Sequence, residues 1–152
     1  MKYYYLSKFI AGIYRQSKNE FNQQLANLNL RATQSDLLLF IVEHPNLMQR
    51  EIAQQMVIDP SLLAKDLQVL LHQKLITRNK DSADGRVKRI TATTNGKSEV
   101  LKLKQVMETW WQNLFAQHQE LNTTEFFKQL EMGYQAICFR DTNVSSVVNK
   151  HN

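Results

Sequence analysis

Basic and polar side chains in the middle of the sequence are the residues best suited to chemistry, and that chemistry is the binding of a polyanion. Residues 47–97 carry nine Lys and Arg against five Asp and Glu, and so hold most of the formal net charge of +5. Short or polar side chains within this segment could reach base edges in a major groove about 12 Å wide; they are Ser61, Ala64, Lys65 and Gln68. A solvated basic face would have the same composition, so charge alone leaves both interpretations open.

Other kinds of chemistry find no support in the sequence. The four glycines form no phosphate-binding loop, and no nucleophile elbow or zinc-deaminase motif is present. The four histidines, at positions 44, 72, 118 and 151, have no partner at metal-ligand spacing. We therefore predict a protein that is not an enzyme and uses neither a metal nor a cofactor.

Cysteine usage and hydropathy indicate the compartment. The single cysteine, Cys138, excludes an intrachain disulfide and fits a reducing environment, and its apolar neighbours indicate a buried, inert thiol. No apolar stretch approaches the roughly 18 residues that a membrane-spanning helix needs, and Lys8 interrupts the amino terminus before a signal-peptide core could form. We expect a soluble, cytoplasmic protein without a membrane partner.

The basic segment is predicted to contain two short helices joined by a tight turn. The first helix covers 49–56, and the turn comprises Val57 and Ile58. Asp59 is a good N-cap and Pro60 suits the first position of the second helix, because the missing N–H of proline costs nothing there. Leucines on one stripe carry this helix through to about residue 73.

Two β-branched, roughly alternating runs follow at 75–80 and 87–93. The pair Asp84-Gly85 between them predicts a tight hairpin turn, in which both central residues need a positive φ. Arg86 at the hairpin tip is long and planar enough to enter a minor groove, and Lys88 is a second predicted DNA contact of the hairpin. Two helices followed by a basic hairpin predict a winged helix-turn-helix that binds double-stranded DNA.

Long amphipathic helices are predicted on both sides of this lobe. The first covers 3–28, and a second helix begins at the cap Thr33, with Asp36 reaching back to its first turn. Residues 98–121 keep a seven-residue apolar repeat, which is typical of a helix that packs lengthwise on another helix. Asn122 then caps a last helix.

The predicted fold is therefore mainly α with a small β-hairpin: a winged helix-turn-helix with long terminal dimerisation helices. Residues 33–97 form the DNA-binding lobe, and residues 1–32 and 98–148 form the dimerisation helices of one compact chain without an independent linker. The end helices have too little partner surface in their own chain, so a homodimer is expected to bury their apolar stripes. The interface is expected to contain Leu6, Ile10, Leu103, Trp110, Phe127 and Tyr134.

The sequence resembles the MarR (multiple antibiotic resistance regulator) family of transcription factors. Residues 47–53 are similar to the opening of that family's third helix, and the spacing of its wing motif is matched by Asp84, Arg86, Thr93 and Gly96. The resemblance covers nearly the whole chain in helix order. Lys74 departs from it by standing where the family usually has a helix-ending Gly, so the turn there must use another cap or a strained residue.

This resemblance implies a homodimeric regulator, most often a repressor, that reads a pseudo-palindromic site with halves about 34 Å apart. Asp84 would orient Arg86, and Arg86 would read the minor groove. The residues implied for the major groove are Ser61, Leu62, Ala64, Lys65 and Gln68. Gln49 and Arg50 would lie near phosphates of the DNA backbone. Leu62 replaces a small polar residue, and it either meets a thymine methyl group or packs against protein.

Family members commonly respond to a small amphipathic or anionic effector bound between the lobe and the dimer helices, a coupling between distinct sites. Aromatic residues that could line such a pocket, although they are more often core, are Tyr14, Phe40, Trp110 and Trp111. The alternative function is a winged-helix protein without an effector, which binds DNA constitutively or binds a protein partner. A steep loss of duplex affinity with salt would favour DNA over a protein partner.

Overall fold

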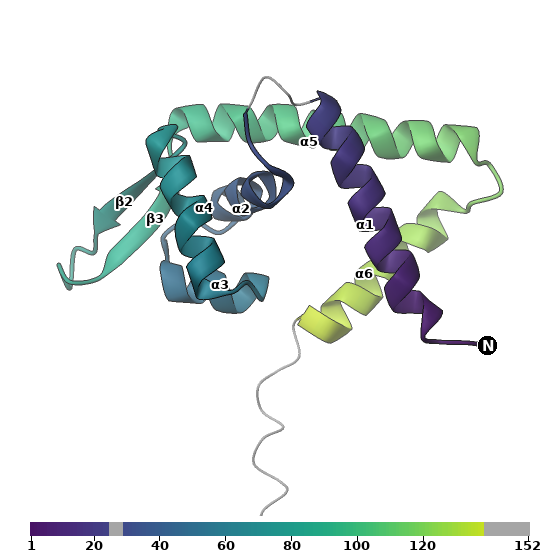
Figure 1. Ribbon diagram of the computed structural model, residues 1–152, viewed down its shortest axis with the longest axis horizontal. Helices are drawn as coiled ribbons and strands as arrows, with labels where there is room; N and C mark the ends of the chain where they lie inside the picture. The colour runs from purple at the N-terminus through teal and green to yellow at the C-terminus, as the bar shows by residue number, and fades with distance from the viewer. Residues whose placement is uncertain (25–28, 139–152) are drawn as a thin grey trace, which may run out of the picture. The chain divides into compact units, whose positions relative to one another are not determined.

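The computed structural model describes residues 1–24 and 29–138, and its two compact units, residues 1–112 and a second unit from residue 113, are described separately. Helices and a small antiparallel sheet make up the described chain (Figure 1), which confirms the predicted fold class. The elements are α1 (Tyr5–Gln24), α2 (Ala32–Glu43), β1 (Leu47–Met48), α3 (Gln49–Met56), α4 (Pro60–His72), β2 (Ile76–Lys80), β3 (Lys88–Ala92), α5 (Thr94–Gln117) and α6 (Thr123–Cys138).

The two short helices, α3 and α4, form where the sequence predicts them. Asp59 caps α4, because its Oδ1 accepts the backbone N–H of Leu62 at 3.1 Å and that of Ser61 at 2.9 Å. These hydrogen bonds stabilise the carboxylate and hold the pKa of Asp59 below its ordinary value. Val57 ends α3 in the left-handed region, at φ 53°. A β-branched residue is strained there, so the turn between the helices stores conformational energy.

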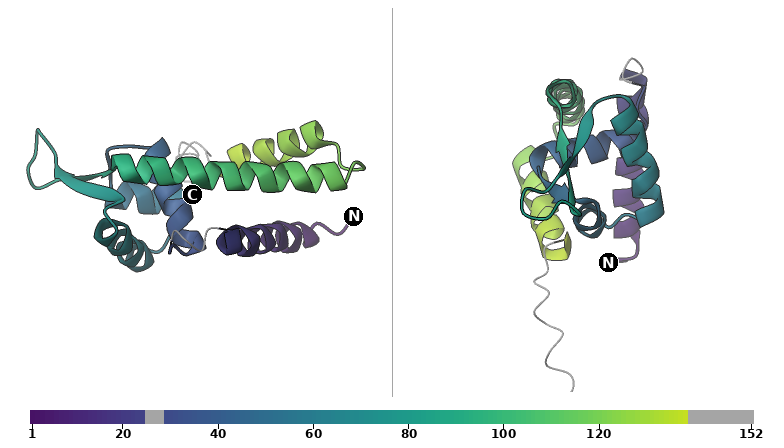
Figure 2. Two further views of the ribbon diagram at one scale, coloured as in Figure 1. Left: turned by 90° about the horizontal axis from the view of Figure 1, so that it is seen from above. Right: turned by 90° about the vertical axis from the view of Figure 1, so that its left-hand side faces the viewer.

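The hairpin of β2 and β3 belongs to a three-stranded sheet whose order is β1-β3-β2. Leu47 of β1 lies opposite Ile90 of β3, and Ile90 lies opposite Arg78 of β2. The hairpin projects from the helices of its unit, as Figure 2 shows. The sequence did not predict β1, because a strand of two residues is too short to show alternation.

The turn at the hairpin tip differs from the predicted one. Gly85 does not have a positive φ. The backbone N–H of Val87 donates to the carbonyl oxygen of Asp84 at 2.9 Å. The backbone N–H of Asp81 donates to the carbonyl oxygen of Val87, also at 2.9 Å. The hairpin is thus confirmed, but the predicted tight turn is wrong. The connection is longer, with residues 81–87 outside both strands.

A junction of α4, β2 and α5 fixes where the hairpin starts. Lys74 has a φ of 57°, so it is the strained residue that the missing glycine required. The hydroxyl of Thr93 donates to the carbonyl oxygen of Lys74 at 2.8 Å and accepts the N–H of Gly96 at 3.0 Å. A Cβ on Gly96 would overlap the carbonyl oxygen of Leu75. The capping by Thr93 also starts α5 at Thr94, four residues before the predicted residue 98.

The start of α2 also differs from the prediction. Arg31, not Thr33, is the N-cap, and its N–H donates to Oε1 of Gln34 at 3.0 Å. Asp36, predicted to cap the helix, instead joins α2 to α1. A different polar residue, Gln34, therefore satisfies the free N–H at the helix start.

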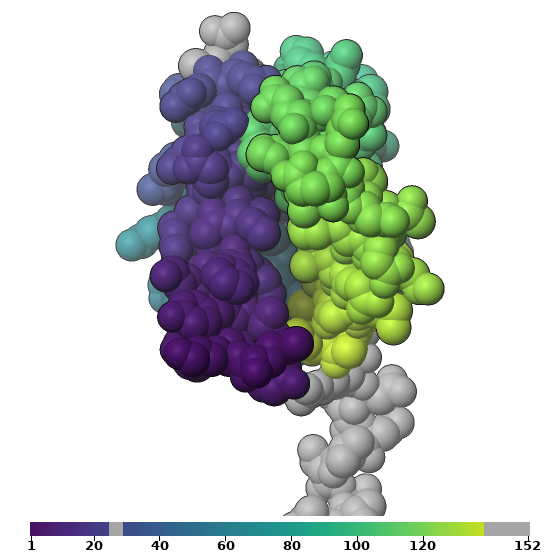
Figure 3. Space-filling model, turned by 90° about the vertical axis from the view of Figure 1, so that its right-hand side faces the viewer, coloured from purple at the N-terminus to yellow at the C-terminus, as the bar shows by residue number. Residues whose placement is uncertain are grey.

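Two polar contacts join α1 to α2. The hydroxyl of Tyr14 donates to Oδ2 of Asp36 at 2.9 Å, and Lys18 pairs with Oδ1 of the same carboxylate. Burial, together with the negative charge of Asp36, raises the pKa of Tyr14 to about 12. Helix α1 lies at the surface in Figure 3 (purple). Residues 25–28, included in the predicted first helix, lie outside the described residues.

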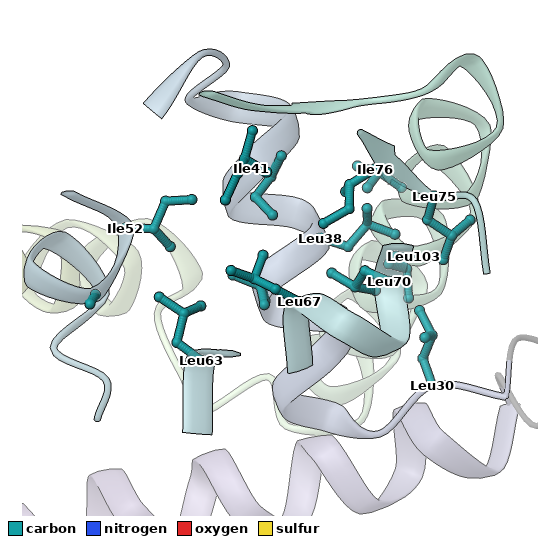
Figure 4. Packing of buried hydrophobic residues seen from close by; sticks show 14 of the residues in the cluster. Leu30, Leu38, Ile41, Ile52, Leu63, Leu67, Leu70, Leu75, Ile76 and Leu103 are labelled. Atoms are coloured by element: carbon teal, nitrogen blue, oxygen red, sulfur yellow. The ribbon is translucent and has the colours of Figure 1, made fainter. Parts of the chain in front are cut away.

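Helix α2 packs through the core of the first unit. Its residues Leu37, Leu38 and Ile41 are buried in one cluster with Leu67 and Leu70 of α4. Figure 4 shows Leu38, Leu67 and Leu70 together, with side chains from the sheet and from α5 around them. Full burial of a leucine contributes about 1.5–3 kcal/mol. This packing fixes which face of α4 is left for solvent.

The apolar repeat of α5 packs inside its own chain. Leu103 is only 2% exposed and belongs to the core cluster. The ring of Trp110 meets the ring of Phe21 edge-on, with centroids 5.5 Å apart, and its Nε1–H donates to Glu20. The expectation that Leu103 lies in a dimer interface is therefore wrong, because the side chain is already buried. Trp110 likewise packs on α1 of its own chain. Helix α5 ends at Gln117 rather than at residue 121.

In the second unit, α6 begins as predicted. Oδ1 of Asn122 accepts the N–H of Glu125 at 3.0 Å. None of the residues of α6 is buried, and Phe127 and Tyr134, on its predicted inner face, are exposed. Cys138 is exposed too, which corrects the expectation of a buried thiol. The tail after Arg140 lies outside the described residues.

Membrane insertion has no candidate segment in the described chain. Over residues 1–24 and 29–138, no helix combines the length and the apolar character needed to cross a bilayer.

We expect Gly96→Ala to lower the free energy of unfolding by about 2 kcal/mol or more, because the new methyl group collides with backbone. Urea denaturation measures this. Gly12→Ala is the matched control, since nothing lies within 4 Å of a Cβ there and alanine favours the helix. Equal effects of the two substitutions would contradict the close approach at Gly96.

We expect Val57→Gly to raise the free energy of unfolding by about 1 kcal/mol, since glycine relieves the strain at φ 53° and loses part of the gain to chain entropy. Val57→Ala should gain less, because alanine keeps its Cβ. Thermal and urea denaturation check both values. A loss of stability in Val57→Gly would show that the valine side chain makes a stabilising contact.

Candidate nucleic-acid interface

Helix α4 presents one buried and one open face. Leu63, Leu67 and Leu70 are buried, whereas Ser61, Lys65 and Gln68 are exposed on the opposite side. Ala64 is half-buried at the edge of the open face. Leu62 is 43% exposed and is not part of the core cluster. The structure therefore leaves all five predicted recognition residues at least partly accessible.

A buried carboxylate fixes α4 to the start of α2. Asp66 is 3% exposed, and its Oδ1 accepts Nε2 of Gln34 at 3.0 Å and Nη2 of Arg31 at 3.2 Å. A buried charge is costly unless it is paired, so this contact ties the orientation of α4 to that of α2. The sequence analysis missed Asp66. The available signal was a charged residue on the leucine stripe, three residues after Leu63 and four before Leu70.

A second carboxylate organises the loop at the hairpin tip. Asp81 pairs with Arg89 and accepts the N–H of Ala83 at 2.8 Å and that of Asp84 at 3.2 Å. These contacts, led by the guanidinium of Arg89, lower the pKa of Asp81 to about 2. Arg89 also donates to the carbonyl oxygen of Asn46 at 2.9 Å. Asp81 and Arg89 were not predicted, because residues eight apart reveal their pairing only once the register is known.

Arg86 extends from this organised loop into solvent. Its side chain is 98% exposed, and its Nε lies 4.0 Å from Oδ1 of Asp84. The same oxygen accepts the backbone N–H of Arg86 at 3.0 Å. Asp84 thus fixes the backbone at the tip while the guanidinium stays available for a ligand. Such a planar cation suits a minor groove.

The start of α3 adds polar groups beside the hairpin. Oε1 of Gln49 accepts Nη2 of Arg78 at 3.1 Å. Arg50 is exposed. Of the two predicted phosphate contacts, Gln49 is therefore occupied within the chain, and Arg78, which the sequence analysis did not select, is brought next to it from β2.

A shallow hollow, partly open to solvent, lies between α1, α2 and α5. Its polar lining includes Lys18 and Asp36, and its apolar lining includes Phe21, Leu39 and Met107. The four aromatic residues predicted for an effector pocket do not line it. Tyr14 and Trp110 contact its edge through Asp36 and Phe21, and Phe40 stacks on His44 with ring centroids 4.3 Å apart. The predicted set is therefore not assembled into one site here.

Metal ligands do not gather anywhere in residues 1–24 and 29–138, where no group of three His, Cys, Asp or Glu side chains is placed to hold an ion.

Comparison with known proteins agrees with this geometry. The model of the MarR family matches residues 28–87, which contain the helix-turn-helix, the first strand of the hairpin and the loop that follows it. No curated protein matches the chain.

Solved structures extend the likeness beyond that segment. A structure of MarR superposes with a TM-score of 0.76 at 25% identity, covering 89% of this chain and 92% of that one. A structure of the transcriptional regulator SlyA gives 0.72 at 25% identity, covering 86% and 90%. CouR from Rhodococcus jostii RHA1, solved with p-coumaroyl-CoA, shares the fold at 21% identity and a TM-score of 0.72, covering 88% and 91%.

The family consists of transcription regulators rather than enzymes, in agreement with the sequence-based prediction. The match of residues 28–87 to the family model and the fold shared with MarR and SlyA show that the chain has the winged helix-turn-helix of MarR-family DNA-binding regulators.

Proposed function

We propose that the protein acts in the cytoplasm as a homodimeric repressor that binds a pseudo-palindromic operator and is released by a small-molecule effector. The observation that carries this proposal is the joint exposure of the N-terminal half of α4 and of Arg86, on a scaffold that buries the opposite face of α4. A helix and a flexible cation held in this way suit simultaneous contact with a major and an adjacent minor groove.

Each exposed group has a specific role in the proposed complex. Gln68 suits an adenine edge, Lys65 a guanine edge or a phosphate, and Ser61 either kind of partner. Arg86 enters the minor groove, where narrow A·T tracts concentrate negative potential. Arg50 contacts the phosphate backbone, which contributes affinity but no sequence information.

Uncovered apolar faces support the proposed homodimer. On α1 in the first unit, Leu6, Phe9 and Ile10 are each more than half exposed. On α6 in the second unit, Phe127 and Tyr134 are also more than half exposed. Isolated exposed leucines are ordinary, but whole apolar helix faces mark interaction surfaces. A symmetric dimer would cover them and set two copies of α4 at a fixed separation.

The pocket between α1, α2 and α5 is the proposed effector site. It joins an apolar floor to the Lys18–Asp36 pair, and so suits a small amphipathic or anionic molecule. CouR, one of the similar structures, was solved with p-coumaroyl-CoA bound. An effector that displaces Asp36 from Lys18 would loosen the link between α1 and α2, and so change the spacing of the two reading helices.

Selection of bound duplexes from a random pool is the experiment that tests this function, and repeating it with candidate effectors tests release. Enrichment of sequences with two-fold symmetry is expected. A DNA contact that releases counterions must weaken steeply between about 50 and 200 mM salt. If no sequence is enriched and binding is insensitive to salt, the proposed DNA-binding function is replaced by the alternative, a winged helix that binds a protein.

Arg86→Ala should weaken binding to the selected operator about tenfold or more, because the minor-groove contact is lost. Arg86→Lys is the matched control: it keeps the charge, and so most of the salt dependence, but lacks the planar group. Fluorescence anisotropy on operators with A·T or G·C flanks measures both variants. Unchanged affinity in Arg86→Ala would refute the role of the hairpin tip.

Leu6→Asp combined with Ile10→Asp should convert the dimer to a folded monomer, because two charges cannot be buried in an apolar interface without partners. An increase of 100-fold or more in the dimer dissociation constant is expected, about 3 kcal/mol. Asn19→Asp, an exposed change on the polar side of α1, serves as the control. Sedimentation velocity decides the matter: a double variant that still sediments as a dimer rules out this face.

A further inference from the structure

Two lysines face each other across the hairpin without a counterion. Lys80 of β2 and Lys88 of β3 are directly opposite in the register, and both are exposed. No ion pair joins either of them to a carboxylate in the described part of the chain. Arg89 and Arg86 differ in this respect, since Arg89 is paired with Asp81 and Arg86 lies near Asp84, whereas Arg78 donates a hydrogen bond to Gln49.

The two lysine side chains are held at the shorter of the two cross-strand spacings. The N–H of Asp81 donates to the carbonyl oxygen of Val87, which makes that pair a hydrogen-bonded one. Such pairs alternate with non-hydrogen-bonded pairs along an antiparallel ladder, so Lys80 and Lys88 form a non-hydrogen-bonded pair, with Cα atoms about 4.5 Å apart. Like charges directly opposite at this spacing destabilise a sheet.

The pair also lies on the side of the hairpin that faces the helix-turn-helix. Because side chains alternate along a strand, Lys80 shares its face with Arg78 and Ile76. Arg78 binds Gln49 at the start of α3, and Ile76 is buried in the core. The two ammonium groups therefore extend the basic surface of α3 and α4 outward along the hairpin, toward Arg86.

We propose that Lys80 and Lys88 form a clamp for one phosphodiester group of the DNA backbone, which supplies the negative charge that the free hairpin lacks. This inference rests on the proposed DNA-binding function; it adds Lys80 to the predicted contact of Lys88 and assigns one backbone phosphate to the pair. Two ammonium groups at one spacing can share the oxygens of a single phosphate, and their mutual repulsion in the free protein falls when that anion binds. The clamp contacts no base, so it strengthens binding to every sequence.

The clamp predicts opposite effects on binding and on stability. Lys80→Gln and Lys88→Gln should each weaken binding to a mixed-sequence duplex several-fold, and each should lower the slope of log K against log salt by at most about 0.9, the value for the one phosphate that the two lysines share. Each should also raise Tm by about 1 °C in the absence of DNA, because the repulsion is removed. A lysine with only a structural role would not give this combination.

The test uses the full-length protein, a mixed-sequence 24-base-pair duplex and fluorescence anisotropy between about 50 and 200 mM salt, with thermal denaturation of each variant. Lys97→Gln, an exposed charge in the first turn of α5, is the matched control and should leave the slope unchanged. Lys80→Arg should retain binding.

The outcomes separate this inference from the function on which it rests. If the unaltered protein binds with a steep salt dependence and both glutamine variants keep its slope, the clamp is overturned while DNA binding stands. An equal loss in Lys97→Gln also overturns it, because the effect would then be one of net charge. If the unaltered protein shows no salt-dependent binding to any duplex, the proposed function and the clamp fail together.

Discussion

The division of α4 into a buried and an open face is the constraint on which the rest of the structure depends. Three leucines and the carboxylate of Asp66 hold one face against α2, and the opposite face is left to Ser61, Lys65 and Gln68. A helix held by leucines alone can slide or rotate by repacking, whereas a buried carboxylate has few positions in which both donors reach it. The leucines therefore stabilise the packing of α4 on α2, and Asp66 fixes the orientation of α4.

Polar contacts likewise fix the hairpin, at its root and at its tip. Its root is fixed by Thr93 and Gly96, and its tip by Asp81, whose carboxylate gathers a guanidinium and two backbone N–H groups. Charges inside the hairpin are thus neutralised where they are structural and left free where they are accessible. The strained residues Val57 and Lys74 stand at the two ends of α4. Both strains are the cost of placing α4 between sharp reversals of the chain.

The helices outside the lobe show why a periodic pattern does not identify its own partner. The apolar repeat of α5 was assigned to a second copy of the chain, yet Leu103 is buried in the core of its own unit. A heptad pattern predicts that a helix packs lengthwise, and it is the same whether the partner is internal or external. On α1 and α6 the apolar residues stay exposed, which leaves those helices as the candidates for the dimer.

Local chemistry was enough to predict the order of the helices and the hairpin, the bounds of α3, the caps Asp59 and Asn122, and the strain at Lys74, because each depends on residues within a few positions of one another. The two-residue strand β1, the cap at Arg31, the pairing of Asp81 with Arg89 and the partners of Asp66 were decided by the tertiary structure. Each of these joins residues that only folding brings together, or replaces a locally adequate partner by a distant one. The lysine pair on the hairpin belongs to both groups: composition supplied the two charges, and the register placed them opposite each other.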